Sequence, residues 1–339
     1  MTKKVSLKDI AQKAGVSTTL VSYVVNNLKS NRINKETARR IREIASSLNY
    51  RTNQVARSLK TNRTFTIGVI VADISNPFSA NLVRIIEDEA DRHGYTVLFG
   101  SSDENLQKFG KLLDTFVNRQ VDGLILSPPA FAESQIQELE QTGLPFVLLD
   151  RYYADIKTSY VALDNFHATK EAVNQLIHVG RKKIGMITYQ SGLIHLQERK
   201  RGYLSALEEN NIEFQENWLK EIDFTRDKEE VILALDEMQV PGSSTDAVLL
   251  ASNNIATIGL KHINALRIKV PEDLAIISFD QSEMLDVFYS PVSYIKQPIR
   301  EMGQKAMLFL IKKMDDPKNI STASLKSELI VRDLSLIHI

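Results

Sequence analysis

A short stretch near the N-terminus is rich in small hydrogen-bonding side chains that could contact DNA. They belong to one expected helix and its N-cap: Ser17, Thr18, Thr19, Ser22, Tyr23 and Asn26. Most of them lie at the N-terminal end of that helix, which is the end that a recognition helix inserts into the major groove to reach base edges. Serine and threonine are also ordinary caps and surface residues, so this composition alone leaves both interpretations open.

The segment from Ser6 to Asn27 has the pattern of two short helices joined by a tight turn. Ser6 and Asp9 have the spacing of a capping box, and Gly15 can adopt the left-handed conformation that ends a helix. Apolar residues recur at helical spacing on both sides of the turn: Leu7, Ile10, Ala11 and Ala14, then Leu20, Val21, Val24 and Val25. The pattern predicts a helix-turn-helix, with the helix N-termini at Ser6 and Ser17 available to DNA phosphates.

A third helix is expected after Asn34, over residues 35–48, so that residues 1–50 would form a three-helix headpiece. Its polar face carries Arg39, Arg40 and Arg42, which we expect to be a mixture of solvated charges and phosphate contacts.

The charge of the chain is unevenly distributed. Residues 1–63 hold 14 of the 42 Lys and Arg residues but only three of the 42 Asp and Glu residues, although the whole chain is neutral. A basic segment on a neutral protein is typical of polyanion binding. Together with the helix-turn-helix pattern, this distribution predicts double-stranded DNA as the partner.

Length and composition limit the class of protein. A chain of 339 residues with 43% hydrophobic content suggests two or three packed domains. The absence of cysteine excludes disulfides and thiolate metal sites, and we expect neither a metal nor a cofactor. The sequence has no Arg-rich leader and no apolar stretch of membrane-spanning length, so we expect a cytoplasmic protein without a membrane partner.

The polar segment 51–64 looks like a linker, yet Val55, Ala56 and Leu59 have helical spacing within it. An isolated helix of this length is marginal in water, so it would form only on something to pack against. The phrases VSTTLVSYVVNN, LNYRTNQVARSLKTN and IGVIVADISNPFSANLVRIIEDEA together resemble the LacI/GalR family of bacterial transcription repressors. The resemblance covers nearly the whole chain.

This resemblance implies that the linker is a hinge helix that folds on the operator. Val55 would pair with its copy in a dimer, and Leu59 would enter the minor groove as an apolar wedge that kinks the DNA. Ala56 is small enough to let the backbone approach, and Asn53 and Lys60 complete the expected hinge contacts with DNA.

The chain also departs from the family pattern. Thr52 stands where many members have proline, and Leu20 and Tyr23 stand where many have threonine and arginine. Since Tyr23 replaces an arginine that could read guanine, the operator sequence should differ from those of other members.

From Phe65 onward, short apolar runs alternate with amphipathic helices, which predicts two consecutive doubly wound α/β lobes. The expected strands are 65–71, 95–101, 123–127 and 146–150 in the first lobe and 183–189, 246–252 and 274–280 in the second. The resemblance implies a periplasmic-binding-protein-like (type I) core. Its N-terminal lobe would comprise residues 65–163 and 293–322, and its C-terminal lobe residues 164–292 and 323–332.

Ligands of open parallel sheets bind beyond the carboxyl ends of the strands, and these positions are polar here. Asp73, Ser75 and Asn76 follow the first strand, and Ser127, Asp150, Asn253 and Asp280 follow later ones. By resemblance, the residues that would hold a small effector are Phe78, Arg199, Asn253 and Asp280, with Asn76 and Phe224 as further candidates.

An aromatic ring with Arg, Asn and Asp suits a sugar, because planar polar groups pair with neighbouring hydroxyls and the ring covers an apolar face. The same set would accommodate a purine. Each residue also has a structural interpretation: Asp280 could cap a helix, Asn76 could belong to a turn and Phe78 could belong to the core.

Two other classes of function lack their motifs. No dinucleotide fingerprint, P-loop, G-x-S-x-G or H-E-x-x-H occurs, and the six histidines are scattered, so we expect no catalytic residues. A sugar-binding protein of a transport system would need a secretion signal in place of the basic headpiece. We therefore predict a homodimeric repressor of a pseudo-palindromic operator, controlled by a small effector between the lobes. The few residues after Val331 are too short for a tetramer-forming coiled coil.

Overall fold

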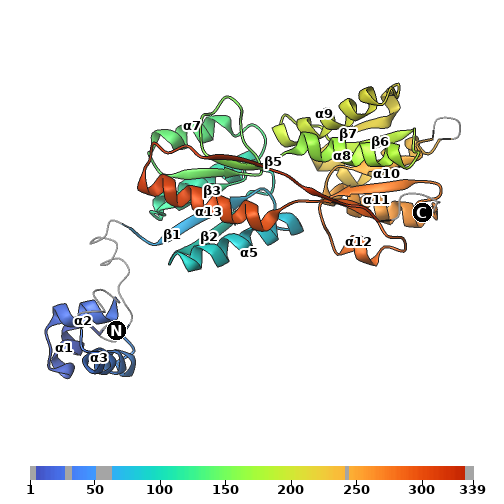
Figure 1. Cartoon of the computed structure of the whole chain (residues 1–339). Helices are drawn as coiled ribbons and strands as arrows, with labels where there is room; N and C mark the ends of the chain where they lie inside the picture. Colours follow the sequence, from blue (N-terminus) through green and yellow to red (C-terminus); the bar gives the residue numbers. More distant parts are fainter. Residues whose placement is uncertain (1–4, 27–32, 51–62, 241–243, 333–339) are drawn as a thin grey trace. The chain divides into compact units, whose positions relative to one another are not determined.

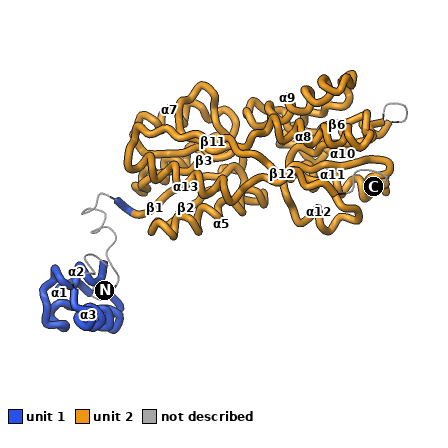
Figure 2. Tube along the Cα trace, in the orientation of Figure 1, with its two compact units in different colours: residues 1–64 blue, residues 65–339 orange. Residues whose placement is uncertain are grey.

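The computed structural model describes residues 5–26, 33–50, 63–240 and 244–332. The chain divides into two compact units, residues 1–64 and residues 65–339, which are coloured separately in Figure 2. The bounds of the headpiece helices are α1 Leu7–Ala14, α2 Thr18–Val25 and α3 Lys35–Ser47.

The headpiece has its own small hydrophobic core. Ile10 of α1, Val21 of α2 and Ile41 of α3 are completely buried in it. Each helix supplies one apolar stripe to this core and leaves its polar face in solvent, as the spacing of apolar residues predicts. The three-helix headpiece is therefore confirmed.

The first lobe of the second unit contains a six-stranded sheet in the order β11-β5-β4-β3-β1-β2, with all pairs parallel. The strands are β1 Thr66–Val71, β2 Thr96–Ser101, β3 Gly123–Leu126, β4 Phe146–Leu149, β5 Tyr160–Leu163 and β11 Thr322–Leu325. The helices are α5 Pro77–Arg92, α6 Leu106–Asn118, α7 Glu133–Gln141 and α13 Ile299–Asp315. One core cluster joins the sheet to α5 and α13, and another joins it to α6 and α7, so helices cover both faces.

Helix α13 comes late in the sequence but packs beside α5 on the first lobe (Figure 1). Gly303 makes this close approach possible, because a Cβ atom there would lie 2.7 Å from Cγ2 of Ile85. Residues 299–315, which the family resemblance assigns to the N-terminal lobe, therefore form a helix that packs on that lobe.

The second lobe repeats the arrangement with the strand order β12-β10-β9-β8-β6-β7. Its strands are β6 Ile184–Tyr189, β7 Leu219–Ile222, β8 Ala247–Leu250, β9 Ala275–Phe279, β10 Ser293–Lys296 and β12 Glu328–Ile330. Its helices are α8 Asn165–His178, α9 Ile194–Glu209, α10 Asp227–Met238, α11 Asn253–Leu266 and the short α12 Met284–Val287. Helices α8 and α9 cover one face of the sheet, and α10 and α11 cover the other.

The chain passes between the lobes three times, and two of these passages fall later than expected. Strand β10 pairs with β9 of the second lobe, so residues 293–296 do not belong to the first lobe. Strand β11 pairs with β5 of the first lobe, so residues 323–325 do not belong to the second. The passages therefore follow Leu163, Lys296 and Leu325. Both strands have only four residues, SYIK in β10 and TASL in β11, and carry little apolar signal, which is why the boundaries differ from the expectation.

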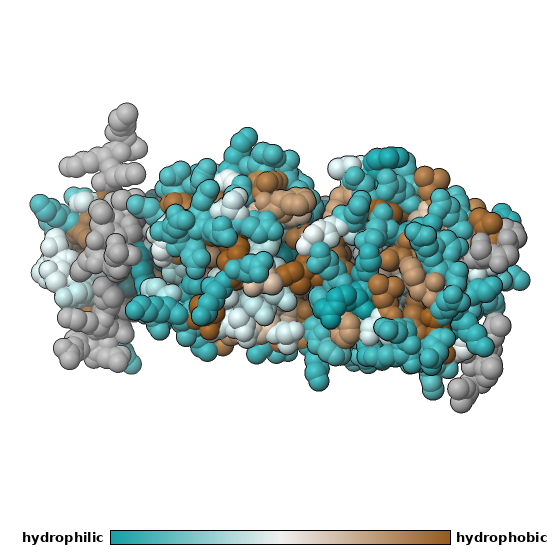
Figure 3. Space-filling model, turned by 90° about the horizontal axis from the view of Figure 1, so that it is seen from above, coloured by the Kyte–Doolittle hydropathy of each residue, from teal (hydrophilic) through white to brown (hydrophobic). Residues whose placement is uncertain are grey.

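The face of the molecule drawn in Figure 3 is mostly hydrophilic, with hydrophobic residues in small separate groups. Among the described residues, no helix combines the length and the apolar character needed to cross a membrane.

Candidate DNA-reading helix and ligand site

The ends of the first two helices are built as the sequence predicts. The Ser6 side chain accepts from the Asp9 amide, and the Asp9 carboxylate accepts from the Ser6 amide at 2.8 Å, which completes the capping box. Gly15 ends α1 with φ 66°, and Ser17 begins α2 by accepting from the Leu20 amide at 3.2 Å. These local bonds fix the turn between the two helices.

The polar residues of α2 differ in how accessible they are. Thr18 and Thr19 in the first turn, and Ser17 before them, are exposed. Ser22, Tyr23 and Asn26 are half-buried, and Asn26 Nδ2 donates to the Ser22 carbonyl at 2.8 Å. Thr18 and Thr19 are therefore the best placed of the predicted residues to meet base edges, because their side chains reach solvent from the helix N-terminus.

The expected phosphate-binding arginines lie on the exposed face of α3. Arg39, Arg40 and Arg42 are all exposed, and Arg39 lies 3.7 Å from Glu43 with both side chains more than 60% accessible. An exposed pair of this kind contributes little stability, so Arg39 can exchange it for a phosphate at small cost. The expected hinge residues Asn53, Val55, Ala56, Leu59 and Lys60 lie outside the described residues.

The two lobes place an aspartate at the same topological position. Asp150 follows β4 and Asp280 follows β9, and each of these strands is third in its sheet order. Both residues have left-handed backbones, with φ 68° for Asp150 and 74° for Asp280. Aspartate tolerates this conformation better than most residues, and it turns the side chain away from the strand end. Each lobe thus contributes one carboxylate at an equivalent place.

Arg199 of α9 contacts several other residues of the second lobe in this site. Its Nε donates to Asn165 Oδ1 at 2.8 Å, its Nη1 donates to the Ala251 carbonyl at 2.7 Å, and its guanidinium lies 3.4 Å from the centre of the Phe279 ring. Asp280 interacts with this guanidinium. Arg199 is only 4% exposed, so its geometry is fixed by protein groups on several sides.

Asp280 is held within the second lobe. Its Oδ1 accepts from Gln297 Nε2 at 2.6 Å, and it also accepts from the Asn253 amide. Arg199, Asn253 and Asp280, three of the six residues expected to bind an effector, are therefore brought together.

Further residues join this group, and three of them, Glu104, Arg151 and His195, were not identified from the sequence as site residues. Arg151 makes a bidentate ion pair with Glu104, with Nη1 at 2.7 Å from Oε2 and Nη2 at 2.6 Å from Oε1. The Asp150 carboxylate, 4.0 Å from Arg151 Nε, also interacts with Arg199 and Asp280 of the second lobe. Buried His195 of α9 completes the group, since it experiences the charges of Arg151 and Arg199. We call these residues the interlobe cluster: Glu104, Asp150, Arg151, His195, Arg199, Asn253, Asp280 and Gln297.

The interlobe cluster contains an unusual number of buried polar atoms without a partner. Nine such side-chain atoms occur in the described part of the chain, and five belong to this cluster: Asp150 Oδ1, Arg151 Nε, His195 Nδ1, Asn253 Oδ1 and Gln297 Oε1. A buried polar atom without a hydrogen bond costs about 1 to 3 kcal/mol, so several in one place indicate a site for a polar ligand.

Burial and charge shift the ionisation of the cluster. Burial raises the pKa of Asp150 to about 6, an effect that the charges of Asp280 and Glu104 increase and those of Arg151 and Arg199 oppose. Burial also raises the pKa of Asp280, and it lowers the pKa of His195 well below its usual value with the help of Arg151 and Arg199. At neutral pH His195 is therefore uncharged and Asp150 is mostly ionised.

The other three expected effector residues have structural roles in this structure. Asn76 is the N-cap of α5 and accepts from the Phe78 amide at 3.0 Å, while the Phe78 ring packs against the core of the first lobe. Phe224 stacks on Tyr189 with ring centres 3.7 Å apart and packs against the core of the second lobe. These are the structural interpretations that the sequence had left open for Asn76 and Phe78.

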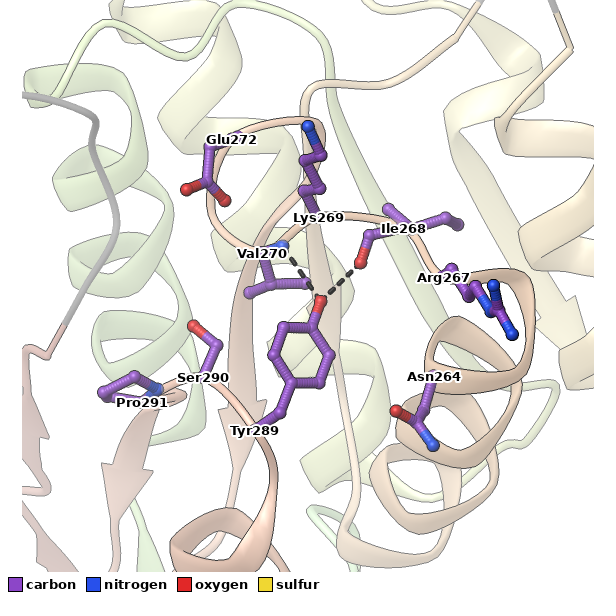
Figure 4. Close-up of a pocket in the computed structure, with 9 residues that line it drawn as sticks. All are labelled: Asn264, Arg267, Ile268, Lys269, Val270, Glu272, Tyr289, Ser290 and Pro291. Carbon is purple, nitrogen blue, oxygen red and sulfur yellow. Dashed lines mark hydrogen bonds between the residues drawn. The ribbon is translucent and has the colours of Figure 1, made fainter.

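A separate pocket of about 490 Å³ lies in the second lobe, between the end of α11 and the segment before β10 (Figure 4). Tyr289 stands at its centre, with its hydroxyl accepting from the Val270 amide and donating to the Ile268 carbonyl. It contains none of the interlobe cluster residues. Apart from buried Ser290, its polar side chains are exposed, so the interlobe cluster, with several buried polar groups in one place, is the better candidate for specific binding.

Comparison with known proteins identifies the class. Residues 6–53 match the model for bacterial regulatory proteins of the lacI family, and residues 173–333 match that for a periplasmic binding protein-like domain. A ribose operon repressor of Haemophilus influenzae is 31% identical over 97% of this chain and 98% of its own length. The repressor CytR of Escherichia coli is 31% identical over 96% of this chain and 95% of its own length. The chain belongs to the LacI family of bacterial transcriptional regulators.

Solved structures agree with this assignment. The lac repressor dimer bound to operator and an anti-inducer has the same fold, with a TM-score of 0.85 and 23% identity over 99% of this chain and 100% of that chain. A LacI family regulator of Enterococcus faecium with bound ribose has a TM-score of 0.69 and 26% identity over 80% of this chain and 98% of that chain. The predicted combination of a helix-turn-helix headpiece with a two-lobed α/β core is confirmed. The curated relatives named above are repressors and not enzymes, as the missing catalytic motifs predicted.

Proposed function

We propose that this protein is a transcriptional repressor that binds a pseudo-palindromic operator as a homodimer and is controlled by a sugar bound at the interlobe cluster. Such a regulator acts on DNA in the cytoplasm. One observation carries the proposal. The same chain has a helix, α2, whose first turn exposes hydrogen-bonding side chains, and a cluster of buried polar atoms from two lobes that lack hydrogen-bond partners.

In the proposed complex, the first turn of α2 enters the major groove. Thr18 and Thr19 contact base edges, Ser22, Tyr23 and Asn26 lie further along the helix, and Ser6 and Ser17 bring helix N-termini to the phosphates. The hinge residues Val55 and Leu59 act at the centre of the operator, where two apolar wedges from a dimer kink the DNA.

The chemistry of the interlobe cluster favours a ligand with many hydroxyl groups. Asp150 Oδ1, Asn253 Oδ1 and Gln297 Oε1 are acceptors, while His195 Nδ1 can accept or donate according to its tautomer. A sugar hydroxyl both donates and accepts, so one ligand can satisfy several of these atoms. The name of the Haemophilus relative and the ribose in the Enterococcus structure support the same ligand class.

A purine effector has less support. Phe78 is half-buried and packs against the core of the first lobe, and Phe224 already stacks on Tyr189. A flat base would have to find another aromatic surface, whereas a sugar needs mainly the hydrogen bonds that the cluster offers.

The effector would control DNA binding by changing how the two lobes of the core are arranged. The cluster residues are less than 10% exposed, apart from Glu104. A ligand that contacts Asp150 in one lobe and Asp280 in the other therefore favours one lobe arrangement over another. A coupling free energy of about 1 to 3 kcal/mol between sugar and operator is typical of such regulators, and it acts in both directions.

Selection of binding sites from random DNA tests the DNA-binding half of the proposal. We expect a two-fold symmetric site whose binding weakens steeply as salt increases, because phosphate contacts release counterions. Thr18→Ala should weaken this site about tenfold and leave non-specific binding unchanged, while Ser46→Ala on the exposed side of α3 should leave both specific and non-specific binding unchanged. Leu59→Ala should likewise lose specific binding far more than non-specific binding. An asymmetric selected site would contradict the homodimer.

A titration of the operator complex with sugars tests the effector half. An active sugar should change operator affinity about fivefold or more, and Arg199→Ala should abolish the change. Arg201→Ala, an exposed position on the same helix, should keep it. An equal response in the Arg199→Ala variant would show that the sugar binds elsewhere.

A further inference from the structure

We infer that the interlobe cluster selects an effector without an anionic group, and that Glu104 sets this selectivity by occupying Arg151. The inference rests on the proposed function and refines its ligand class. It separates free sugars from sugar phosphates and other acidic polyols.

The charges of the interlobe cluster disfavour an anion. The cluster holds two guanidinium groups, Arg151 and Arg199, and three carboxylates, Glu104, Asp150 and Asp280. With His195 neutral, the sum is one negative charge in a region that is largely closed to solvent. A phosphate ester would add negative charge beside these carboxylates, where low solvent access strengthens the repulsion.

Arg199 is poorly placed to bind an incoming anion. Its Nε and Nη1 are used by Asn165 and Ala251, one face lies on the Phe279 ring, and its charge is offset by Asp280 and Asp150. A phosphate at this guanidinium would compete with two buried aspartates.

Arg151 would be the natural phosphate ligand, because a guanidinium binds phosphate in the same bidentate way as a carboxylate. In this chain Glu104 already holds both of its Nη atoms, at 2.6 and 2.7 Å, and Arg151 Nη1 also donates to the Pro128 carbonyl at 3.2 Å. Only Nε remains without a partner, and a single N–H cannot reproduce the bidentate bond.

The backbone fixes Glu104 in this position. Asp103 and Glu104 are consecutive residues with left-handed backbones, φ 52° and 54°, in the turn between β2 and α6. The Glu104 amide donates to the Ala72 carbonyl at 2.9 Å, and Asn105 immediately caps α6. Two adjacent non-glycine residues in this conformation persist only where the surrounding structure holds them. The turn therefore fixes the backbone position from which the Glu104 side chain reaches Arg151.

The groups that remain available are suited to hydroxyls. The unpartnered oxygens of Asp150, Asn253 and Gln297 all accept hydrogen bonds, and a phosphate dianion has no hydrogen to donate to them. Uncharged hydroxyls can donate to all three. These atoms therefore favour the hydroxyl groups of a ligand and give no hydrogen bond to a phosphate dianion placed against them.

Calorimetric titration of the full chain with matched pairs tests the inference. Suitable pairs are ribose with ribose 5-phosphate and glucose with glucose 6-phosphate, extended to other neutral sugars and their phosphates. We expect the active neutral sugar to bind at least tenfold more tightly than its phosphate. Glu104→Gln should reduce this ratio at least tenfold, because it removes one negative charge and releases Arg151. Glu104→Asp, which keeps the charge, should retain most of the ratio.

Glu138→Gln is the matched control, since it removes one negative charge from an exposed position on α7 of the same lobe and should leave the ratio unchanged. Operator binding and the melting temperature report whether each variant is folded. If the parent binds the sugar phosphate more tightly than the neutral sugar, the inference is wrong. It is also wrong if a folded Glu104→Gln protein keeps the parent's ratio of the two affinities. Neither result would contradict the proposed function. A parent that binds operator but neither kind of sugar would overturn the sugar effector of the proposed function and this inference together.

Discussion

The two lobes carry equivalent aspartates that are supported differently. Asp280 accepts hydrogen bonds from Gln297 and from the Asn253 amide and lies beside Arg199. Asp150 has one buried oxygen without a partner, and its neighbour Arg151 is bound to Glu104. The two aspartates thus occupy equivalent strand ends with the same left-handed backbone. The Asp280 carboxylate already has its hydrogen-bond donors, whereas the Asp150 carboxylate still has an oxygen that can accept from a ligand. Topological equivalence fixes where a side chain lies, but its neighbours decide whether it can bind a ligand.

The largest expected effect comes from removing the Arg199 guanidinium, the positive charge beside Asp280 in the second lobe. Arg199→Leu should lower the free energy of unfolding of the second unit by about 3 to 5 kcal/mol, because it leaves the buried Asp280 carboxylate without a neighbouring positive charge and the Ala251 carbonyl without its donor. Urea unfolding measures the loss. Arg201→Leu is the control, and a loss below about 1 kcal/mol for Arg199→Leu would mean that Asp280 does not depend on this partner.

The raised pKa of Asp150 predicts that the stability of the fold depends on pH in a way that an uncharged residue at this position would not produce. Because its pKa of about 6 in the folded protein lies above the ordinary 3.8, the protonated form stabilises the fold below pH 4, and this contribution is lost as the pH rises through 6. The loss amounts to about 3 kcal/mol at pH 8. Asp150→Asn should remove this dependence, so the variant should gain stability over the parent between pH 4 and pH 8 in urea unfolding. Parallel pH profiles for the two proteins would contradict the burial of an ionised Asp150.

Removing the hydrogen bond from Gln297 should make Asp280 resemble Asp150. Gln297→Ala should cost about 2 kcal/mol, the usual range for a hydrogen bond to a charged group. It should also raise the pKa of Asp280 further, because a donor to the ionised form is lost. Chemical shifts of the Asp280 carboxyl carbon across a pH titration measure this change. A pKa that stays constant would show that Arg199 and the Asn253 amide alone hold the carboxylate.

The smallest expected effect concerns ligand affinity. If ionised Asp150 accepts a hydroxyl of the sugar, the affinity should fall as the pH drops below 6, by about tenfold, or 1.4 kcal/mol, per unit of pH. Calorimetry of the active sugar at pH 5, 6 and 7 measures this slope, and Asp150→Asn should remove it. A constant affinity in the parent would assign the ligand contact to Asp280 and not to Asp150.

The elements of the core could be predicted where their apolar signal was continuous. The strands β1, β3, β4, β8 and β9 are nearly uninterrupted apolar runs, as strands buried on both faces should be. The apolar pattern did not predict β5, which has four residues, or β7, whose sequence LKEI includes two charged residues. It also missed α8, although this helix packs closely on α9, where a Cβ on Gly202 would lie 2.3 Å from the Phe166 carbonyl oxygen.

The candidate site was predicted only in part. Arg199, Asn253 and Asp280 were identified through the family resemblance, but Glu104, Arg151 and His195 were not. The signal available for Arg151 was its place directly after a strand end. Asn76 and Phe78 show why residue type alone is ambiguous, because a helix cap and a ring packed against the core use the same residue types as a sugar site.

The sequence by itself determined the headpiece and the alternation of strands and helices. The Ser6 hydroxyl accepts from the Asp9 amide, and the Ser17 hydroxyl accepts from the Leu20 amide, so each serine caps its own helix. Gly15 ends the first of these helices, so the bonds that define the helix ends all join residues close in sequence. Only the tertiary structure decided the ligand site. Glu104 meets Arg151 across 47 residues, and Asp150 and Asp280 approach each other from different lobes. Local spacing cannot encode such contacts, because they depend on strand order, on passages between lobes and on the burial that those passages create.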